Sequence, residues 1–239
     1  MSTTTSRTQI GECRCGARVE RELPEGRFAA LAARLPFVCG ACARREEAEL
    51  EAEQAALEQE RREARIRRRR ERAGLPDGLT GCPLEQPDAR AWAEGRVPGL
   101  MLTGPVGVGK TTAAAAAAEH VLRRGRPLRW LSAPLLFARL GSGMGTRQRE
   151  QALDALTGSH ALVLDDIDKA RPTEYAAEHV FLAVDTRITD RTPLLITSNM
   201  SLAELAQRWP DPYGEAIASR IAGYCRIAFL DGIDRRTAP

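Results

Sequence analysis

The sequence predicts an α/β protein built on a parallel β-sheet, preceded by a small cysteine-containing segment and a long charged helix. Three observations support this fold class. A glycine-rich loop ending in Gly109-Lys110-Thr111 lies between an apolar run and an alanine tract. Beyond it, short apolar runs alternate with helix-forming segments, as a parallel sheet with crossover helices requires. Residues 43–73 consist mainly of helix formers and contain neither glycine nor proline.

The composition is that of a globular protein with one α/β core and a smaller appendage, because the chain has 239 residues and 43% hydrophobic residues. Arginine supplies all basic residues except Lys110 and Lys169, so arginine richness alone says little about nucleic acid. The segment Met1–Gln9 is polar, and no apolar run reaches the ~20 residues that cross a bilayer. We therefore expect a cytoplasmic protein without membrane contact, whose cysteines stay reduced.

Four cysteines near the amino terminus predict a metal site. Cys13 and Cys15 form one pair, and Cys39 and Cys42 form a second pair 23 residues later. Two such knuckles are typical of a zinc ribbon, in which four thiolates bind Zn²⁺. The first knuckle departs from the commoner C-x₂-C spacing, and reduced cysteines without metal are the alternative. We expect residues 1–45 to form a zinc-ribbon-like module that binds a partner.

A long charged helical linker is predicted over residues 46–73, within the helix-forming stretch 43–73, which would span about 45 Å. Its charge is polarised, with an excess of acidic residues before residue 61 and of arginines after it. Arg67–Arg70 could meet phosphates, or they could form a solvated helix surface. Gly74 and Pro76 end the helix, so residues 74–239 form the next domain.

The glycine-rich loop is a P-loop, because it joins a strand over Gly99–Thr103 to a helix. Glycines allow its N–H groups to surround a polyphosphate, and the helix dipole favours the same anion. The Lys110 side chain can reach the β- and γ-phosphates of ATP, and the Thr111 hydroxyl can bind Mg²⁺. The predicted ATP-binding residues are Gly104, Pro105, Val106, Gly107, Val108, Gly109, Lys110, Thr111 and Thr112.

Further strands and helices follow the P-loop in alternation. The predicted strands cover residues 128–132, 161–166, 193–199 and 226–230. One predicted helix begins near residue 135, and three others cover about residues 147–156, 174–188 and 216–221. Ligands of such a sheet bind beyond the carboxyl ends of the strands, so polar residues at these ends are candidate site residues.

Two carboxylates and an amide end two of these strands. Asp165 ends a buried strand of Walker B type and would hold Mg²⁺, while Asp166 would polarise the attacking water. Aspartate is shorter than the glutamate common at the second position, so hydrolysis would be slow or partner-dependent. Asn199 would contact the γ-phosphate or the water. Alternatively, Asn199 belongs to a turn before a helix that Ser201 caps.

The segments Gly99–Thr111, Leu162–Ile167, Thr197–Asn199 and Ala216–Ile221 together resemble the DnaC/DnaI/IstB group of AAA+ ATPases. The resemblance covers about Leu75–Arg236. It implies a five-stranded parallel sheet in the order 5-1-4-3-2, flanked by helices, and it matches Arg235 and Arg236 to a basic pair. Nine residues follow Leu230, so we expect no carboxyl-terminal helical lid.

The resemblance also implies that Arg220 is an arginine finger that completes a neighbouring subunit's site. The alternative is a surface ion pair within one subunit. Asp168 departs from the family pattern, in which a small residue is usual, so the following loop is expected to differ. Lys169 and Arg171 in this loop could meet DNA phosphates or simply be exposed.

The group contains two branches with different partners. Helicase loaders resemble this chain most, because their amino-terminal domain is often a zinc module, and the IstB branch usually lacks a cysteine ribbon. The resemblance therefore implies an ATPase that loads the replicative DNA helicase onto single-stranded DNA and assembles on that helicase. An IstB-like helper of a transposase and an ATP-binding switch adaptor with little hydrolysis are the alternatives. A small-molecule kinase would need an acceptor pocket and a lid, which the sequence does not indicate.

Overall fold

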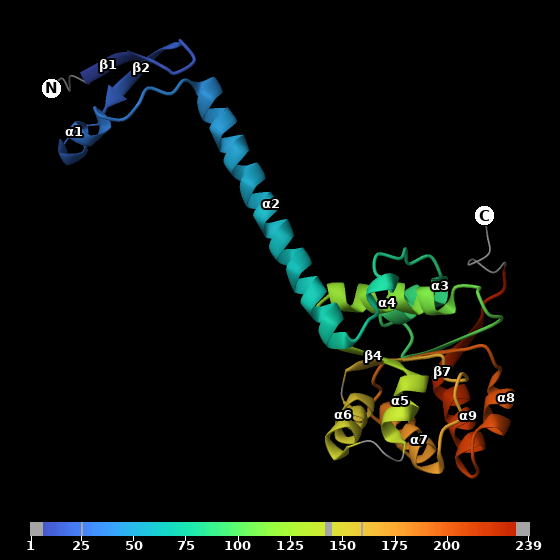
Figure 1. The fold of residues 1–239 in the computed structure, drawn as a ribbon. Helices are drawn as coiled ribbons and strands as arrows, with labels where there is room; N and C mark the ends of the chain where they lie inside the picture. Colours follow the sequence, from blue (N-terminus) through green and yellow to red (C-terminus); the bar gives the residue numbers. More distant parts are fainter. Residues whose placement is uncertain (1–6, 25, 142–144, 159, 233–239) are drawn as a thin grey trace. The chain divides into compact units, whose positions relative to one another are not determined.

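The computed structural model describes residues 7–24, 26–141, 145–158 and 160–232. The chain divides into two compact units, Met1–Ala64 and Arg65–Pro239. The boundary falls within the long helix α2 (Gly40–Ala73), which is visible in Figure 1. In the described ranges, no helix is both long and apolar enough to cross a membrane.

The first unit is a small β-hairpin with little apolar burial. Strand β1 (Arg7–Glu12) pairs antiparallel with β2 (Arg18–Leu23), and a 3₁₀ turn (Gly26–Phe28) leads into the short helix α1 (Ala29–Ala32). Among the described residues of this unit, the only buried ones are Cys13 and Cys42. Such a unit cannot be held by the hydrophobic effect alone, which supports a structural role for its cysteines.

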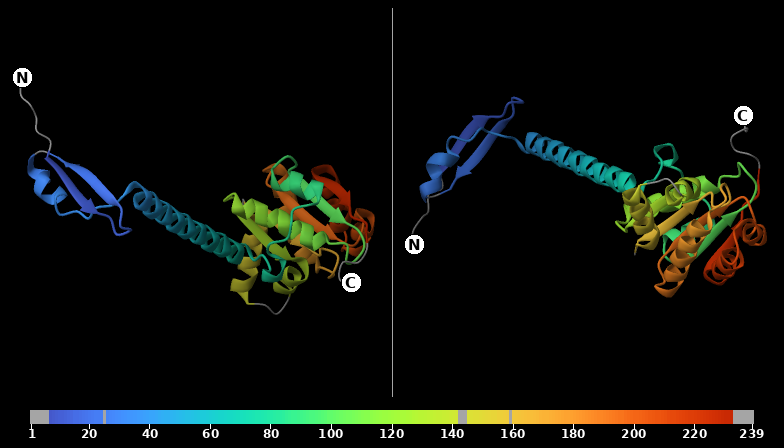
Figure 2. Two further views of the ribbon diagram at one scale, coloured as in Figure 1. Left: turned by 90° about the horizontal axis from the view of Figure 1, so that it is seen from above. Right: turned by 60° about the horizontal axis from the view of Figure 1, so that its bottom comes forward.

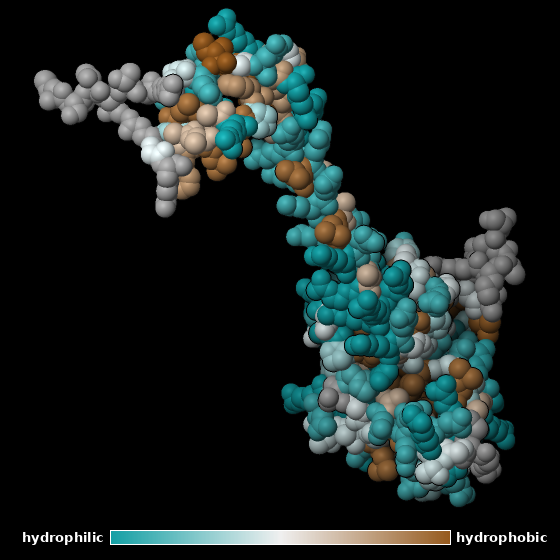
Figure 3. All heavy atoms as spheres, turned by 60° about the vertical axis from the view of Figure 1, so that its left-hand side comes forward, coloured by the Kyte–Doolittle hydropathy of each residue, from teal (hydrophilic) through white to brown (hydrophobic). Residues whose placement is uncertain are grey.

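Helix α2 confirms the long helix that the sequence predicts, with its start at Gly40 rather than residue 43. Side chains in its middle are nearly all exposed, and hydrophilic residues cover most of it in Figure 3. The helix ends in a Schellman motif, in which the Leu75 amide donates to the Arg70 carbonyl and Gly74 adopts a φ of 77°. Glycine is favoured there because positive φ is strained for other residues.

A five-stranded parallel sheet forms the centre of the second unit (Figure 2). Its strands are β3 (Gly99–Thr103), β4 (Leu128–Ser132), β5 (Ala161–Asp165), β6 (Leu194–Ser198) and β7 (Cys225–Phe229). The spatial order is β4-β5-β6-β3-β7, which confirms the predicted order 5-1-4-3-2 when the strands are numbered along the chain. The pairing places Thr103 opposite Ser198, and Ser132 opposite Asp165. The carboxyl ends of these strands therefore meet at one edge.

Helices cover both faces of the sheet (Figure 1). They are α3 (Pro87–Ala93), α4 (Lys110–Arg123), α5 (Ala133–Leu140), α6 (Thr146–Thr157), α7 (Glu174–Thr189), α8 (Leu202–Arg208) and α9 (Tyr213–Tyr224). Helices α3 and α4 pack on one face and α5 to α9 on the other. A 3₁₀ turn (Asp77–Leu79) precedes α3. The predicted helices are confirmed, with ends one to three residues longer.

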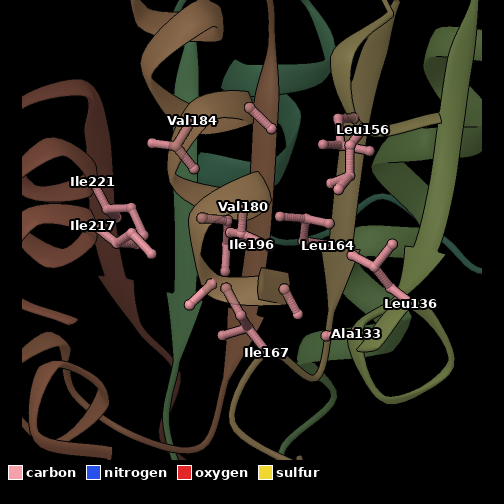
Figure 4. Packing of buried hydrophobic residues seen from close by; sticks show 14 of the residues in the cluster. Ala133, Leu136, Leu156, Leu164, Ile167, Val180, Val184, Ile196, Ile217 and Ile221 are labelled. Carbon is pink, nitrogen blue, oxygen red and sulfur yellow. The ribbon is translucent and has the colours of Figure 1, made fainter. Parts of the chain in front are cut away.

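Buried side chains alternate between two cores. Leu100 and Leu102 of β3 face the core with α4, while Met101 faces the core formed by α5, α7 and α9. Figure 4 shows the second core, in which Ile196 and Leu164 of neighbouring strands meet residues of the covering helices. The central strands are buried on both faces, as expected for a parallel sheet. The three tryptophans, Trp92, Trp130 and Trp209, are all buried.

Candidate nucleotide and metal sites

The P-loop joins the end of β3 to the start of α4. Gly104, Gly107 and Gly109 have φ values of 140°, 86° and 94°, in the region where side chains other than glycine are strained. A Cβ on Gly104 would lie 2.0 Å from the carbonyl oxygen of Leu230. Glycine at this position therefore allows β7 and the chain after it to pack against the loop.

The Lys110 side chain is buried beneath the loop. Its Nζ donates hydrogen bonds to the carbonyl oxygens of Gly104 (2.8 Å) and Pro105 (2.6 Å). Lys110 borders a cavity of about 360 Å³ at the carboxyl edge of the sheet. The other lining residues are Val106, Gly107, Gly109, Thr111, Thr112, Asp166, Lys169 and Asn199. The cavity has the P-loop on one side and residues after β5 and β6 on the other, which suits a polyphosphate.

Asp165 accepts hydrogen bonds from two hydroxyl groups. The Thr111 hydroxyl lies 3.0 Å from Asp165 Oδ1, and the buried Thr197 hydroxyl lies 2.7 Å from the same oxygen. Burial raises the pKa of the Asp165 carboxyl, while the hydrogen bonds from Thr197 and Thr111 act against that rise. A carboxylate beside a threonine hydroxyl is a ligand set that fits Mg²⁺.

Asp166 adopts a backbone conformation rare for residues other than glycine. Its φ is 57°, and its amide donates to the Thr197 hydroxyl at 2.8 Å. Such conformations persist only where the surroundings hold them, and they cluster at functional sites. Asp166 lines the cavity, as expected for a residue that orients a water molecule. Sequence reasoning missed Thr197, which joins Asp165 and Asp166 through one hydroxyl.

Asn199 follows β6 and lines the same cavity as the start of α4. Its backbone amide donates to Asp168 Oδ1 (2.9 Å), and its side-chain Nδ2 donates to Asp168 Oδ2 (2.8 Å). The predicted Ser201 cap is confirmed, because Ser201 and Glu204 form a capping box at the start of α8. Among the hydrogen bonds of the described residues, the Asn199 side chain bonds Asp168 and does not cap this helix.

A second cavity borders the P-loop and the start of α4. It has a volume of about 240 Å³ and shares Gly109 and Thr112 with the first cavity. Gln86, Val108 and Leu230 are among its lining residues. Apolar and amide groups beside a phosphate site suit a nucleotide base. This cavity was not predictable from the sequence, because its lining residues come from three separate segments.

Two basic residues singled out in the sequence lie in different places. Lys169 lines the first cavity, together with Lys110. Arg220 does not line it; its Nε lies 2.6 Å from Asp185 Oδ1, and its guanidinium lies 4.3 Å from the ring centroid of Phe181. Within one subunit, the structure therefore brings together Lys110, Thr111, Asp165, Asp166 and Asn199 but not Arg220. Arg235 and Arg236 lie outside the described residues.

The four amino-terminal cysteines form a second candidate site. Their Sγ atoms all lie within 4.8 Å of one another, and those of Cys15 and Cys39 are 3.5 Å apart. Four thiolates around Zn²⁺ at ~2.3 Å would be separated by ~3.8 Å, so the cluster fits this ion. Backbone hydrogen bonds from Cys15 and Cys39 lower the pKa of the Cys13 thiol to about 6, whereas hydrogen bonds with the other three thiols raise the pKa of Cys42 to about 12.

Comparison with known proteins identifies similarity in the second unit. Residues 90–237 match the model of the family described as IstB-like ATP binding protein. An ATP-binding protein in an insertion sequence of Mycobacterium tuberculosis is 28% identical over 155 residues, 64% of this chain and 61% of the relative. The ATP-binding protein of insertion sequence IS1162 from Pseudomonas fluorescens is 32% identical over 117 residues, 47% of this chain and 51% of the relative. The chain thus spans between half and two thirds of these relatives.

Solved structures share the fold. DnaI matches with a TM-score of 0.54 and 24% identity, covering 66% of this chain and 89% of DnaI. The DnaC helicase loader matches with a TM-score of 0.52 and 22% identity, covering 65% of this chain and all of the DnaC chain. AMPPCP-bound DnaA from Aquifex aeolicus has a TM-score of 0.52 and 17% identity, covering 60% of this chain and 44% of DnaA. At these identities the likeness shows a shared fold alone.

Proposed function

Because the chain belongs to the family of IstB-like ATP-binding proteins, we propose that it hydrolyses ATP at the P-loop cavity and couples this to the delivery of a protein partner to DNA. The observation that carries the proposal is the meeting of Lys110, Thr111 and Asn199 around one cavity, with Asp165 bonded to Thr111. These groups come from the starts or ends of three separate elements. Their convergence on a phosphate-sized site is what ATP hydrolysis requires.

Each residue has a role that follows from its chemistry. The N–H groups of the glycine loop and the start of α4 bind the phosphates, and Lys110 neutralises their charge. Thr111 and Asp165 would hold Mg²⁺, which stabilises charge on the transferring phosphoryl group when bound. Asp166 accepts a hydrogen bond from the attacking water, and Asn199 orients the water or a phosphate oxygen. The second cavity receives the base.

Arg220 is proposed to complete the site of a neighbouring subunit. Its partner Asp185 is 47% exposed and Arg220 is 36% exposed, and such surface ion pairs stabilise by only about 0–1 kcal/mol. A phosphate dianion from another subunit can therefore replace Asp185 at small cost. An arginine supplied in trans contributes about 10³–10⁵-fold in rate, which makes hydrolysis dependent on assembly. The short carboxylate of Asp166 is a second reason for slow hydrolysis by the isolated chain.

Phosphate release by purified protein tests the proposal. The Lys110→Ala variant should lose ATP binding, whereas Arg220→Ala should bind ATP nearly normally and hydrolyse it poorly. A mixture of these two variants should regain partial activity, because mixed interfaces pair an intact P-loop with an intact arginine. Unchanged ATP affinity in Lys110→Ala would refute the placement of the site. Mixtures as inactive as the separate variants would leave Arg220 with its ion pair as its only role.

We propose the replicative DNA helicase as the partner and single-stranded DNA as the DNA substrate. The amino-terminal four-cysteine cluster followed by α2 supports this choice, because it supplies a separate metal-stabilised unit for docking. The ATPase units would then assemble on the helicase ring. A second candidate is a transposase helper, favoured by the two curated relatives from insertion sequences. A switch that binds ATP with little hydrolysis is the third.

Co-purification separates these candidates. A tagged full chain should retain the replicative helicase of its own host in an ATP-dependent manner, and a variant lacking the cysteine ligands should not. Retention of a transposase instead would establish the second candidate. Phosphate release that stays at background with helicase and single-stranded DNA present would favour the switch.

A further inference from the structure

Asp168 holds the side chain of Asn199 in one orientation, and we infer that it is a positioning residue for the hydrolysis proposed above. Both Asp168 oxygens accept hydrogen bonds from Asn199, one from the backbone amide at 2.9 Å and one from Nδ2 at 2.8 Å. The Asp168 side chain is buried, with 6% exposure. A buried carboxylate with two donors from one residue is a stronger constraint than a turn alone supplies.

The carboxylate decides which end of the amide faces it. An ionised carboxylate only accepts hydrogen bonds, so the nitrogen of the Asn199 amide must point toward Asp168. The amide oxygen and the remaining N–H are then left for the cavity, which Asn199 lines together with Thr111 and Asp166. A small residue at position 168 would remove this control, and the amide could rotate.

Asp168 is the third of three successive contacts between the loop after β5 and the end of β6. The Asp166 amide donates to the Thr197 hydroxyl at 2.8 Å, and the Ile167 amide donates to the Thr197 carbonyl at 3.1 Å. Asp168 then bonds Asn199. These three contacts therefore fix Asp166 relative to Asn199. Both residues are proposed to act on the water.

A double-mutant cycle tests the inference. Asp168→Ala should lower kcat about as much as Asn199→Ala, on the order of tenfold to a hundredfold, with ATP affinity within about twofold of wild type. The double variant should be no slower than Asn199→Ala, because Asp168 acts only through Asn199. Asp154→Ala, an exposed aspartate of α6, is the matched control and should be neutral. Losses that multiply in the double variant, or an unchanged kcat in Asp168→Ala, would overturn the inference.

A second measurement does not depend on turnover. In the full chain, NMR signals of the Asn199 side-chain amide, identified by their absence in Asn199→Ala, should be protected from hydrogen exchange. Asp168→Ala should abolish the protection, whereas Asp154→Ala should preserve it. Absence of hydrolysis by wild-type protein would refute the ATPase proposal alone. Unprotected Asn199 protons in wild-type protein would refute the Asp168 contact.

An arginine-rich cavity elsewhere in the second unit carries a separate proposal. The cavity has a volume of about 310 Å³ and is lined by Arg69, Arg72, Arg126, Arg129 and His160, with no acidic residue among its lining residues. Leu128, the first residue of β4, also lines it. It therefore lies at the amino-terminal edge of the sheet, opposite the edge that forms the P-loop cavity. We propose that it binds a phosphate group of DNA.

Three of the four arginines of this cavity are held in place by neutral groups. Arg69 donates to the Leu122 carbonyl at 3.1 Å, and Arg126 and Arg129 donate to carbonyls of Ala93 and Arg72. These bonds fix the guanidinium groups without compensating their charge. Arg70, next to Arg69 on α2, and Arg123 of α4 differ, because both pair with Glu119. An uncompensated group of guanidiniums fits phosphate geometry, and nucleic acid presents phosphates in a row.

Binding of a fluorescent single-stranded 20-mer and its duplex to the full chain tests this site. Arg72→Gln is the variant of choice, because the hydrogen bonds of the described residues include none from its side chain. It should weaken DNA binding on the order of tenfold and reduce the slope of log Kd against log salt by about one. Arg139→Gln, an exposed arginine of α5 on the other face of the sheet, is the control and should change neither. Equal effects of Arg72→Gln and Arg139→Gln would overturn the proposal, and so would wild-type protein that binds neither oligonucleotide. Wild-type protein that binds inorganic phosphate but no DNA would also overturn it.

Discussion

Replacing Thr197 with valine removes one buried hydroxyl and keeps the volume of the side chain. That hydroxyl donates to Asp165 at 2.7 Å and accepts from the Asp166 amide at 2.8 Å. Valine leaves the Asp166 N–H without this acceptor. Of the two hydroxyl groups that donate to Asp165, only that of Thr111 then remains. An unsatisfied buried polar group costs about 1–3 kcal/mol. The variant should therefore lose roughly 2–4 kcal/mol of unfolding free energy.

The loss should be visible in the second unit alone. For a unit of this size, each kcal/mol lowers the unfolding temperature by about 2–4 °C, so the expected drop is roughly 4–16 °C. Tryptophan fluorescence is a suitable assay, because all three tryptophans lie in the second unit. Mg²⁺-dependent hydrolysis should also fall by about 10–100-fold, as is typical when a group that orients a metal ligand is lost.

Thr197→Ser is the matched control. It keeps the hydroxyl and removes one methyl group, which costs about 1 kcal/mol, and it should keep most of the activity. If Thr197→Val unfolded at the wild-type temperature and retained Mg²⁺-dependent turnover, Thr197 would not organise the two aspartates. If serine and valine were equally damaging, packing of the methyl group would be the cause instead of the hydrogen bonds.

Three further outcomes follow from the structure. Metal analysis should find one zinc per chain, and Cys39→Ser or chelation should unfold the first unit without changing tryptophan fluorescence; well under one equivalent would contradict the zinc site. Gly104→Ala should weaken ATP binding more than tenfold because its Cβ would meet the Leu230 carbonyl at 2.0 Å, while Gly78→Ala, with open space around it, should be neutral in the same titration. Lys169→Ala should raise the KM for ATP several-fold because its ammonium borders the cavity, and an equal effect of Arg171→Ala would argue against a specific contact.

Much of the second unit was predictable because its elements carry local signals. The strands are continuous apolar runs, and the loop glycines and Lys110 occur at a spacing that few other structures use. The sheet order came from the family resemblance, since apolar runs do not specify which strand pairs with which. Strand ends shifted by one residue, as at β7, because the last residue of a strand is decided by pairing with its neighbour.

The lining of the candidate site was predictable where a residue belongs to a known motif, and unpredictable where a residue contacts the site only through another residue. Lys110 and Asp165 could be placed from motif and strand position. Asp168 was visible only as a departure from the family pattern, because its partner Asn199 lies 31 residues away along the chain. Thr197 lies in the Thr197–Asn199 segment that carries the resemblance, but no role could be assigned to it. A threonine in an apolar run suits a strand, and its hydrogen bonds to two aspartates depend on the register of β5 and β6.

The use of lysine at the P-loop cavity has a physical reason in this arginine-rich chain. Lys110 is buried, with 5% exposure, and its ammonium donates to two loop carbonyls. An arginine at position 110 would place five N–H donors in a fixed plane where the Lys110 Nζ bonds two carbonyl oxygens. The donors left without an acceptor would be buried, which is costly. The other lysine, Lys169, borders the same cavity. Arginine serves the rest of the described chain, where its fork can cap carbonyls, as Arg187 does for Leu156 and His160. Both lysines line the cavity proposed to bind phosphates, and a compact charge on a flexible stem suits phosphate oxygens there.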